Sequence, residues 1–173
     1  MIHFTPLQAL GASNSAYCIF DQLQLSSVLF GPFTEEKKYE SLAAATKMME
    51  QRYGVWNERD WKARKADHIN DDVAANALGC FVAECGGRLV GYITTRVDTL
   101  NGVGRIPNLA VTEEMRGQGL GRRLIDHALD YFRREGMALA KIETMASNPI
   151  GQKLYPACGF EEVGRQVHYA MRL

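Results

Sequence analysis

An apolar strand, a glycine-rich loop and an amphipathic helix follow one another without interruption in the second half of this chain. The predicted strand spans residues 105–111, and the loop reads Arg116-Gly117-Gln118-Gly119-Leu120-Gly121-Arg122. Apolar residues then recur with the 3.6-residue helical period; they are Leu120, Leu124, Ile125, Ala128, Leu129 and Phe132. This order predicts a right-handed crossover, in which the next strand lies parallel to the first.

The loop has the chemistry of an anion site. Arg116 and Arg122 place positive charge at a helix start, where the helix dipole itself favours negative charge. The glycines beside them leave backbone N–H groups open to a closely bound ligand. Cations and free amides at a helix N-terminus together predict a site for a phosphate-bearing group.

Three other interpretations of the loop fit less well. A Walker loop needs a lysine followed by a hydroxyl residue, and this loop has neither. A dinucleotide fingerprint needs glycine at its first, third and sixth positions. Counted from Gly117, the sixth position is Arg122, although Glu143 resembles the acidic residue that such a motif expects downstream. A glycine turn that only begins a helix leaves both arginines unexplained.

Composition predicts one globular domain over residues 1–173, because the chain is 46% hydrophobic and 23% charged and contains no repeat or linker. Its formal net charge of zero argues against nucleic acid as a partner. No apolar run approaches the roughly 18 residues of a membrane span, and the start lacks a secretory signal. We therefore expect a cytoplasmic protein with no membrane partner. Its scattered cysteines predict reduced thiols and no metal site; they are Cys18, Cys80, Cys85 and Cys158.

The character of the chain changes near residue 78. Before it we predict helices, at 16–25, from Thr34 to Gly54, and in a short segment capped by Asn57 that carries Trp61 and the charges through Asp67. After it we predict an antiparallel meander, a further strand, a short helix and a closing strand pair. The meander comprises 80–84, 88–97 and 105–111, and the further strand spans 140–146. The short helix spans 149–155, and the closing strands span 159–163 and 167–172.

A second motif follows the fifth predicted strand. Asn148 precedes Tyr155, and Cys158-Gly159-Phe160 comes directly after. Together with Arg116-x-x-Gly119-x-Gly121, this motif makes the sequence from about Leu78 to the C-terminus resemble the GNAT family of acetyl-CoA-dependent N-acetyltransferases. The resemblance implies an α+β GNAT fold. Such a fold has a mixed central sheet of six to seven strands, about four helices, and a parallel strand pair that splays at the coenzyme site.

The resemblance also implies how acetyl-CoA, as co-substrate, would bind. The pyrophosphate would lie on the loop amides, and the pantetheine arm would pair with the strand backbone as an added strand does. A thioester carbonyl would accept from an N–H near Leu109 or Ala110, and Asn148 would hold the arm from its other side. The implied binding residues are Leu109, Ala110, Val111, Arg116, Gly117, Gln118, Gly119, Leu120, Gly121, Arg122 and Asn148.

Two proton transfers need catalytic groups. Tyr155 stands where the family keeps a general acid for the departing thiolate, although it could instead cap the core beside Phe160. Glu143, expected in the middle of a strand, is the candidate base, with Glu84 or a water chain as alternatives. An ion pair of Glu143 with Arg105 or Lys141 is an equally simple explanation. His127, expected on the exposed side of the long helix, is no candidate.

The predicted function is transfer of an acetyl group to a primary amine by direct attack in a ternary complex. The acceptor, a small-molecule amine, an amino sugar or a peptide or protein amine, is not identified by the sequence. Residues 1–77 would form the acceptor side and 78–173 the coenzyme-binding core. A non-catalytic acyl-CoA sensor and a dinucleotide-dependent oxidoreductase are the alternatives. A homodimer that pairs through the strand from Val167 stays open.

Overall fold

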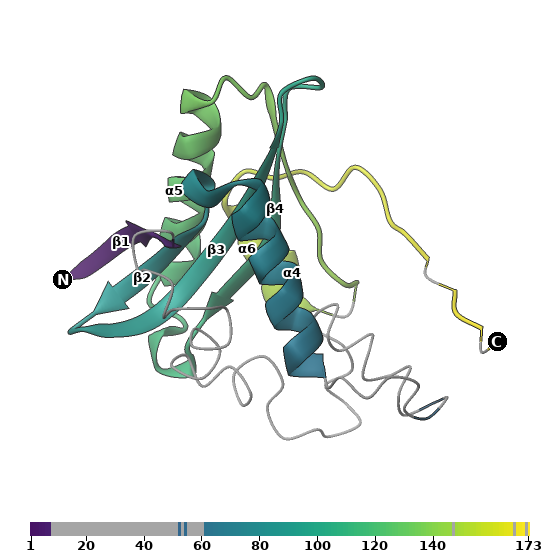
Figure 1. Cartoon of the computed structure of the whole chain (residues 1–173), viewed down its shortest axis with the longest axis horizontal. Coiled ribbons are helices and arrows are strands. Elements are labelled where there is room, and N and C mark those ends of the chain that lie inside the picture. The colour runs from purple at the N-terminus through teal and green to yellow at the C-terminus, as the bar shows by residue number, and fades with distance from the viewer. Residues whose placement is uncertain (8–51, 53, 55–60, 147, 168, 172) are drawn as a thin grey trace.

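The computed structural model describes residues 1–7, 52, 54, 61–146, 148–167, 169–171 and 173. Five strands of this part form one sheet in the order β1-β2-β3-β4-β5, accompanied by three α-helices (Figure 1). The strands are β1 (Ile2–Pro6), β2 (Phe81–Cys85), β3 (Arg88–Asp98), β4 (Val103–Val111) and β5 (Leu139–Ile142). The helices are α4 (Trp61–Ala75), α5 (Leu120–Arg134) and α6 (Pro149–Ala157), with short 3₁₀ turns at Ala77–Gly79 and Glu113–Met115.

The connectivity confirms the predicted α+β architecture. β1 to β4 are antiparallel neighbours, and β4 and β5 are parallel, with α5 as the crossover between them. Gly86 and Gly87 form the turn between β2 and β3, and both have positive φ, at 59° and 75°. The described residues hold five strands rather than the six to seven expected.

Helices cover both faces of the sheet. Phe81 and Val82 are neighbours on β2 and so point to opposite faces. Phe81 belongs to the core that α5 buries, whereas Val82 packs in the core with Ile69 of α4. At Gly104 of β4 an added Cβ would stand 2.5 Å from the Phe132 ring. A glycine there lets α5 pack directly on the strand backbone.

Several predicted boundaries were wrong. The helix expected through Asp67 continues to Ala75, and β1 was not predicted at all. β5 ends at Ile142 instead of reaching residue 146. The helices expected at 16–25 and from Thr34, and the Asn57 cap, lie outside the described residues.

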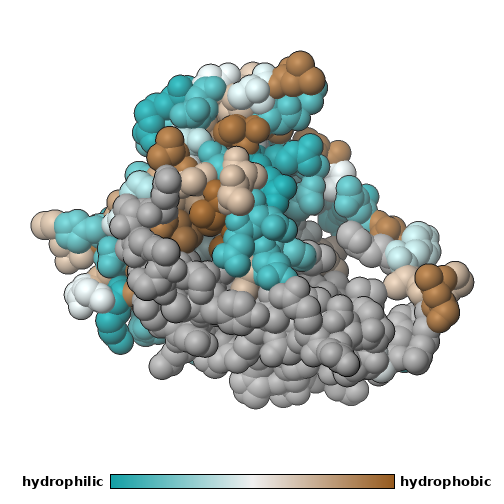
Figure 2. Space-filling model, viewed as in Figure 1, coloured by the Kyte–Doolittle hydropathy of each residue, from teal (hydrophilic) through white to brown (hydrophobic). Residues whose placement is uncertain are grey.

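The closing strand pair is also not formed by the described residues of 159–173. This segment runs away from the sheet as an extended arm (Figure 1). Val163, Val167 and Tyr169 of this segment are exposed. Figure 2 shows hydrophobic residues on the projecting arm. The predicted strand pair is wrong for the described residues, because a strand needs a hydrogen-bonded partner and this segment pairs with none of the described strands.

Candidate active site

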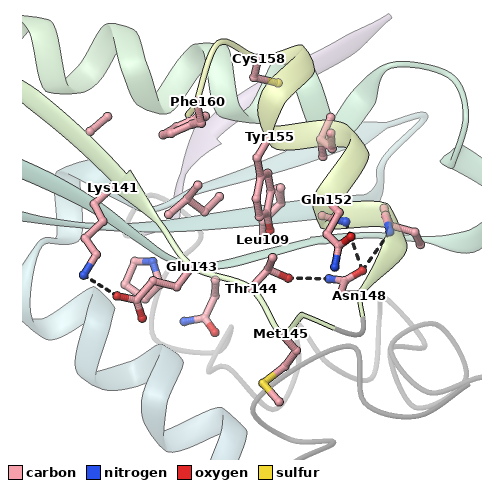
Figure 3. Close-up of a pocket in the computed structure, with 18 of the residues that line it drawn as sticks. Leu109, Lys141, Glu143, Thr144, Met145, Asn148, Gln152, Tyr155, Cys158 and Phe160 are labelled. Carbon is pink, nitrogen blue, oxygen red and sulfur yellow. Dashed lines mark hydrogen bonds and ion pairs between the residues drawn. The ribbon is translucent and has the colours of Figure 1, made fainter. Parts of the chain in front are cut away.

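A groove of about 2040 Å³ opens where β4 and β5 diverge. The parallel ladder ends at the pair Ile106 and Ile142, whereas β4 continues to Val111. The next residue of β4, Pro107, has no N–H with which to extend a ladder. It lies in an irregular part of β4, where the register with β3 shifts opposite Thr94 to Arg96. The groove continues past the glycine loop. Figure 3 shows its part beside α6 and the segment after β5.

The backbone of β4 offers hydrogen-bonding groups to this groove. The Thr112 N–H donates to the Val90 carbonyl at 2.9 Å. Because alternate residues of an antiparallel strand face the same neighbour, Ala110 also pairs with β3, opposite Tyr92. The N–H and C=O groups of Leu109 and Val111 therefore face away from β3, toward the groove. Of the two amides predicted to hold a carbonyl, this geometry favours Leu109 over Ala110.

The glycine loop sets the start of α5. Gly117 and Gly119 have positive φ, at 71° and 79°, and Gly119 is the N-cap. No side chain of the described residues caps this end, and the first helical bond runs from the Arg123 N–H to the Gly119 carbonyl at 3.1 Å. The N–H groups of Leu120, Gly121 and Arg122 precede that bond and have no intrahelical acceptor.

The arginines at the start of α5 lie on two sides of the helix, one toward the groove and one toward β1. Arg116 and Arg122 are exposed and line the groove, as predicted. Arg123 instead lies over the Phe4 ring, 5.2 Å from its centroid. Gln118 was predicted to bind the coenzyme, but it is not among the residues that line the groove. Its side chain turns back and donates to the Glu114 carbonyl at 2.6 Å.

Tyr155 extends from α6 into the groove (Figure 3). Its ring is half-buried and meets Phe160 edge-on, with centroids 6.4 Å apart. Burial raises the pKa of the Tyr155 phenol; a hydrogen bond from Thr144 acts in the opposite direction, and the nearby Cys158 thiol raises the pKa further. The tyrosine thus packs beside Phe160, as expected if it caps the core. It also lines the groove.

Asn148 is the N-cap of α6. Its Oδ1 accepts from the N–H groups of Ile150 and Gly151, each at 3.1 Å, and its Nδ2 donates to the Thr144 hydroxyl at 2.9 Å. Pro149 follows as the first helical residue, where its fixed φ suits a helix start. The motif asparagine therefore orients both the helix and Thr144.

Thr144 is the groove residue that sequence reasoning missed. It lies just after β5, lines the groove, and its hydroxyl accepts from the Asn148 Nδ2 at 2.9 Å. A Cβ added at Gly151 would stand 2.8 Å from the Thr144 Oγ1, so the glycine leaves room for this hydroxyl. The only sequence signal was indirect, in a glycine within the first turn of a short helix.

Glu143 was wrongly placed in the middle of a strand. It follows the end of β5, its side chain is 64% exposed, and its carboxylate pairs with the Lys141 amine at 2.6 Å (Figure 3). The predicted ion pair is thereby confirmed, and Glu143 does line the groove. Glu84, the alternative base, is not among the groove residues and accepts from the Thr5 hydroxyl at 3.2 Å.

His127 does not lie on an exposed face. Its ring stacks on Phe4 at 5.1 Å and meets Phe81 edge-on at 4.4 Å. Burial lowers the pKa of this imidazole. The expectation was wrong because β1, which was not predicted, covers that side of α5.

A buried polar cluster also reaches the groove from the α4 side. Asp72 of α4 is 2% exposed, and its carboxylate accepts from Thr94, Arg96 and Asn108, each at 2.6 Å. Arg96 supplies the compensating charge. This cluster joins α4 to β3 and β4 one residue before Leu109. Sequence analysis did not find it, because its members are far apart along the chain.

Two absences concern the described residues alone. They contain no group of three His, Cys, Asp or Glu side chains that could hold a metal ion. None of the helices described there is both long and apolar enough to span a bilayer. The three cysteines described, Cys80, Cys85 and Cys158, are free thiols.

Known proteins share this arrangement. The model of the acetyltransferase (GNAT) family matches residues 39–160. The mycothiol acetyltransferase of Streptomyces avermitilis is 28% identical over 131 residues, which are 76% of this chain and 41% of that protein. The ribosomal protein bS18-alanine N-acetyltransferase of Escherichia coli K12 is 26% identical over 115 residues, which are 66% of this chain and 70% of that protein.

A solved structure agrees with these sequence matches. The structure of AAC(6')-Iy in complex with the bisubstrate analogue CoA-S-monomethyl-acetylneamine has a TM-score of 0.54 and 26% identity, covering 70% of this chain and 87% of that one. Since the family model covers most of the sequence, the chain belongs to the GNAT acetyltransferase family. It spans about two fifths of the length of the mycothiol acetyltransferases it matches. A model of the glucanotransferase domain of glycogen debranching enzyme also matches residues 1–61, which lie almost wholly outside the described part.

Proposed function

We propose that this chain transfers the acetyl group of acetyl-CoA to a primary amine by direct attack within a ternary complex. One observation carries the proposal: a single groove combines the uncapped N-terminus of α5, the open edge of β4 and the Tyr155 hydroxyl. Acetyl-CoA carries a diphosphate, an amide-rich arm and a thioester in this order. The diphosphate would bind the helix N-terminus, the arm would pair with the strand edge, and the thioester would lie near the tyrosine hydroxyl. Membership of the GNAT family supports this assignment.

The diphosphate end would bind the start of α5. The N–H groups that begin this helix have no intrahelical acceptor, and the dipole favours negative charge there. Arg116 and Arg122 would add charge-assisted hydrogen bonds. We assign no such contact to Gln118, whose amide is held by Glu114.

The pantetheine arm would lie along β4 as an added strand. Leu109 and Val111 direct their N–H and C=O groups into the groove, and their spacing matches the amides of an extended chain. The Leu109 N–H would donate to the thioester carbonyl as negative charge develops on its oxygen. The acyl carbon would then lie between β4 and Tyr155.

Acetyl transfer requires that the acceptor nitrogen lose protons and that the coenzyme sulfur gain one. The amine arrives as an ammonium group and must be deprotonated before it attacks. Glu143 is the candidate base, because its carboxylate is accessible in the groove, although it must exchange its Lys141 partner for the amine or for an intervening water. Tyr155 would protonate the coenzyme thiolate as the tetrahedral intermediate collapses, and it would regain a proton from the second one that the attacking nitrogen releases. No covalent acetyl-enzyme is needed.

The acceptor class is an amine-bearing molecule. The relatives are named for mycothiol, for an N-terminal alanine of a ribosomal protein and, in the structure title, for an acetylneamine analogue. These acceptors share an amino group and little else. We therefore propose a primary amine and assign residues 1–77 to the acceptor side of a single domain, with 78–173 as the coenzyme-binding core.

The test is acetyl-CoA consumption across a panel of amines, followed by loss of thioester absorbance so that protein thiols do not contribute. We expect turnover with at least one amine and a fall of about tenfold or more in kcat for Tyr155→Phe. Phe keeps the ring packed beside Phe160 and removes only the hydroxyl. Acetyl-CoA binding without turnover on any amine would favour the sensor. Binding of a nicotinamide nucleotide instead of acetyl-CoA would favour the oxidoreductase.

A further inference from the structure

Three basic side chains form a row across one face of the sheet. Arg96 of β3 pairs in register with Arg105 of β4, and Arg105 pairs in register with Lys141 of β5. Residues directly opposite each other on neighbouring strands point to the same face of a sheet. Arg96, Arg105 and Lys141 are called the basic row below.

The basic row lies on the face of the sheet that α4 covers. The Arg96 Nε donates to the Asp72 carboxylate of α4 at 2.6 Å, which identifies the face. Arg96 and Lys141 line the groove, and so do Asp72 and Glu143. Arg105 is exposed, and the side chains of Arg96 and Lys141 are 47% and 42% exposed. The row is therefore accessible to a ligand in the groove, beside the candidate base that Figure 3 shows next to Lys141.

Carboxylates compensate the two ends of the row but not its middle. Each outer member pairs with one carboxylate, at 2.6 Å. Arg105 makes no ion pair within the described part of the chain. Hydrogen bonds from Asn101 lower the pKa of Asp98, and Arg105 adds only a smaller electrostatic effect. Because like charges directly opposite each other destabilise a sheet, folding alone does not explain an arginine at this place.

The row has hydrogen-bond donors to spare. A guanidinium group carries five N–H donors, and Arg96 directs only its Nε to Asp72. Its two terminal nitrogens make no hydrogen bond to a described residue. A carboxylate or phosphate can accept two parallel bonds from such a planar group. An oxyanion could therefore bind Arg96 and Arg105 without breaking the ion pair to Asp72.

The distance from the row to the reacting centre follows from β4. Four residues separate Arg105 from Leu109, whose N–H is the proposed donor to the thioester carbonyl. Each residue of a strand advances about 3.3 Å, and the irregular register opposite Thr94 to Arg96 shortens the path, so the separation is about 10–13 Å. A ligand that reaches both places must be extended.

We propose that the basic row binds an oxyanion, a carboxylate or a phosphate, at the far end of the acceptor, about 10–13 Å from the amine that is acetylated. This inference rests on the proposed function and narrows its acceptor class from a primary amine to an extended amine with a negatively charged end. Arg105 is then a specificity residue that touches the acceptor away from the reacting atoms.

The first experiment compares two pairs of acceptors that differ in charge alone. Tetraglycine is compared with tetraglycine amide, and aminohexyl phosphate with aminohexanol; a tetrapeptide spans about 13 Å when extended. We expect the KM of each anionic compound to be about threefold to tenfold lower than that of its neutral partner. The larger ratio identifies the preferred oxyanion. The preference should shrink when salt is raised from about 0.05 M to about 0.5 M.

Variants of the middle cation test the row directly. Arg105→Gln should abolish the preference for the anionic acceptors, and Arg105→Glu should reverse it. Neither change should alter the KM for acetyl-CoA, because Arg105 is not among the residues proposed to bind it. The control is Arg88→Gln, which removes an exposed arginine at the start of β3 that does not line the groove. It should behave as wild type, and the same loss in this control would overturn the inference, because net charge alone would then explain the preference.

A second measurement does not require turnover. The same four compounds are titrated into the free protein, and the backbone amide signals of β4 and β5 are followed by NMR. Tighter binding of the anionic compounds to wild type, lost in Arg105→Gln, supports the basic row. Equal binding of anionic and neutral compounds to wild type overturns the inference, as does a preference that persists in Arg105→Glu. A wild type that acetylates no amine overturns the proposed function instead, and the titration still decides the oxyanion site.

Discussion

Gly119 has a left-handed backbone conformation and lies in the glycine loop at the groove. Its φ of 79° lies in the left-handed region, and no atom of the described residues lies within 4 Å of the position a Cβ would take. Gly119 also lines the groove, at the place where the proposed diphosphate would bind. A side chain here would strain the loop and also occupy the volume of the phosphate oxygens.

We predict that Gly119→Val weakens acetyl-CoA binding about tenfold or more, measured by calorimetry. The control is Gly136→Val, at the opposite end of α5, where φ is 74° and the Cβ position is equally open. Both variants carry a similar backbone strain of about 1–2 kcal/mol, but only the first lies at the groove. Equal affinity in the two variants would mean that the loop has been misassigned.

At the level of elements, Asp72 connects α4 to the sheet. One carboxylate joins donors from β3 and β4 and is almost entirely buried. Removal of the carboxylate would take from the buried Thr94 and Asn108 side chains the acceptor that they share. The neighbouring Asp71 on the same helix is exposed. The two aspartates therefore form a matched pair for a stability measurement.

We predict that Asp72→Ala lowers the free energy of unfolding in urea by about 2–4 kcal/mol, because the buried Thr94 and Asn108 side chains lose the acceptor they share. Asp71→Ala should change it by no more than about 0.5 kcal/mol. Similar losses for the two variants would show that the cluster contributes no special stability.

The open edge of β4 gives an element-scale prediction of its own. Amides of Leu109 and Val111 face the groove, whereas the Ala110 amide faces β3. Amide exchange followed by NMR should therefore be fast at the first two positions and slow at Ala110 in the free protein. Acetyl-CoA should slow the first two selectively. Slow exchange at all three positions in the free protein would contradict the open edge.

For the molecule as a whole, the elements predicted correctly are those whose residue pattern lies within one short stretch of sequence. The helical period of α5, the glycine loop and the meander were all visible in neighbouring residues, and so was the Asn148 to Tyr155 motif. β1 was not, because β2, its partner among the described strands, lies far along the chain, as in the pairing of Phe4 with Ala83. The length of β5 was mispredicted because Pro107, which has no N–H to extend the ladder, lies in another strand.

The site followed the same division. Residue types in a motif pointed to the groove, but the hydrogen bonds between them depend on side-chain directions that no spacing encodes. Thr144 accepts from the Asn148 amide, which is itself oriented by a helix end. Asp72 and Asn108 meet only after α4 packs on the sheet. Sequence reasoning therefore found residues that line the groove better than the hydrogen bonds between them.

The gap beside β4 has a consequence for the life of the protein in a cell. An extended ligand laid against Leu109 and Val111 would complete the sheet, and a ligand held only by the folded chain stabilises it in proportion to the logarithm of its concentration. A shortage of that ligand would leave more molecules open to proteolysis. The rate at which the protein is degraded would then depend on the concentration of activated acyl donor in the cell.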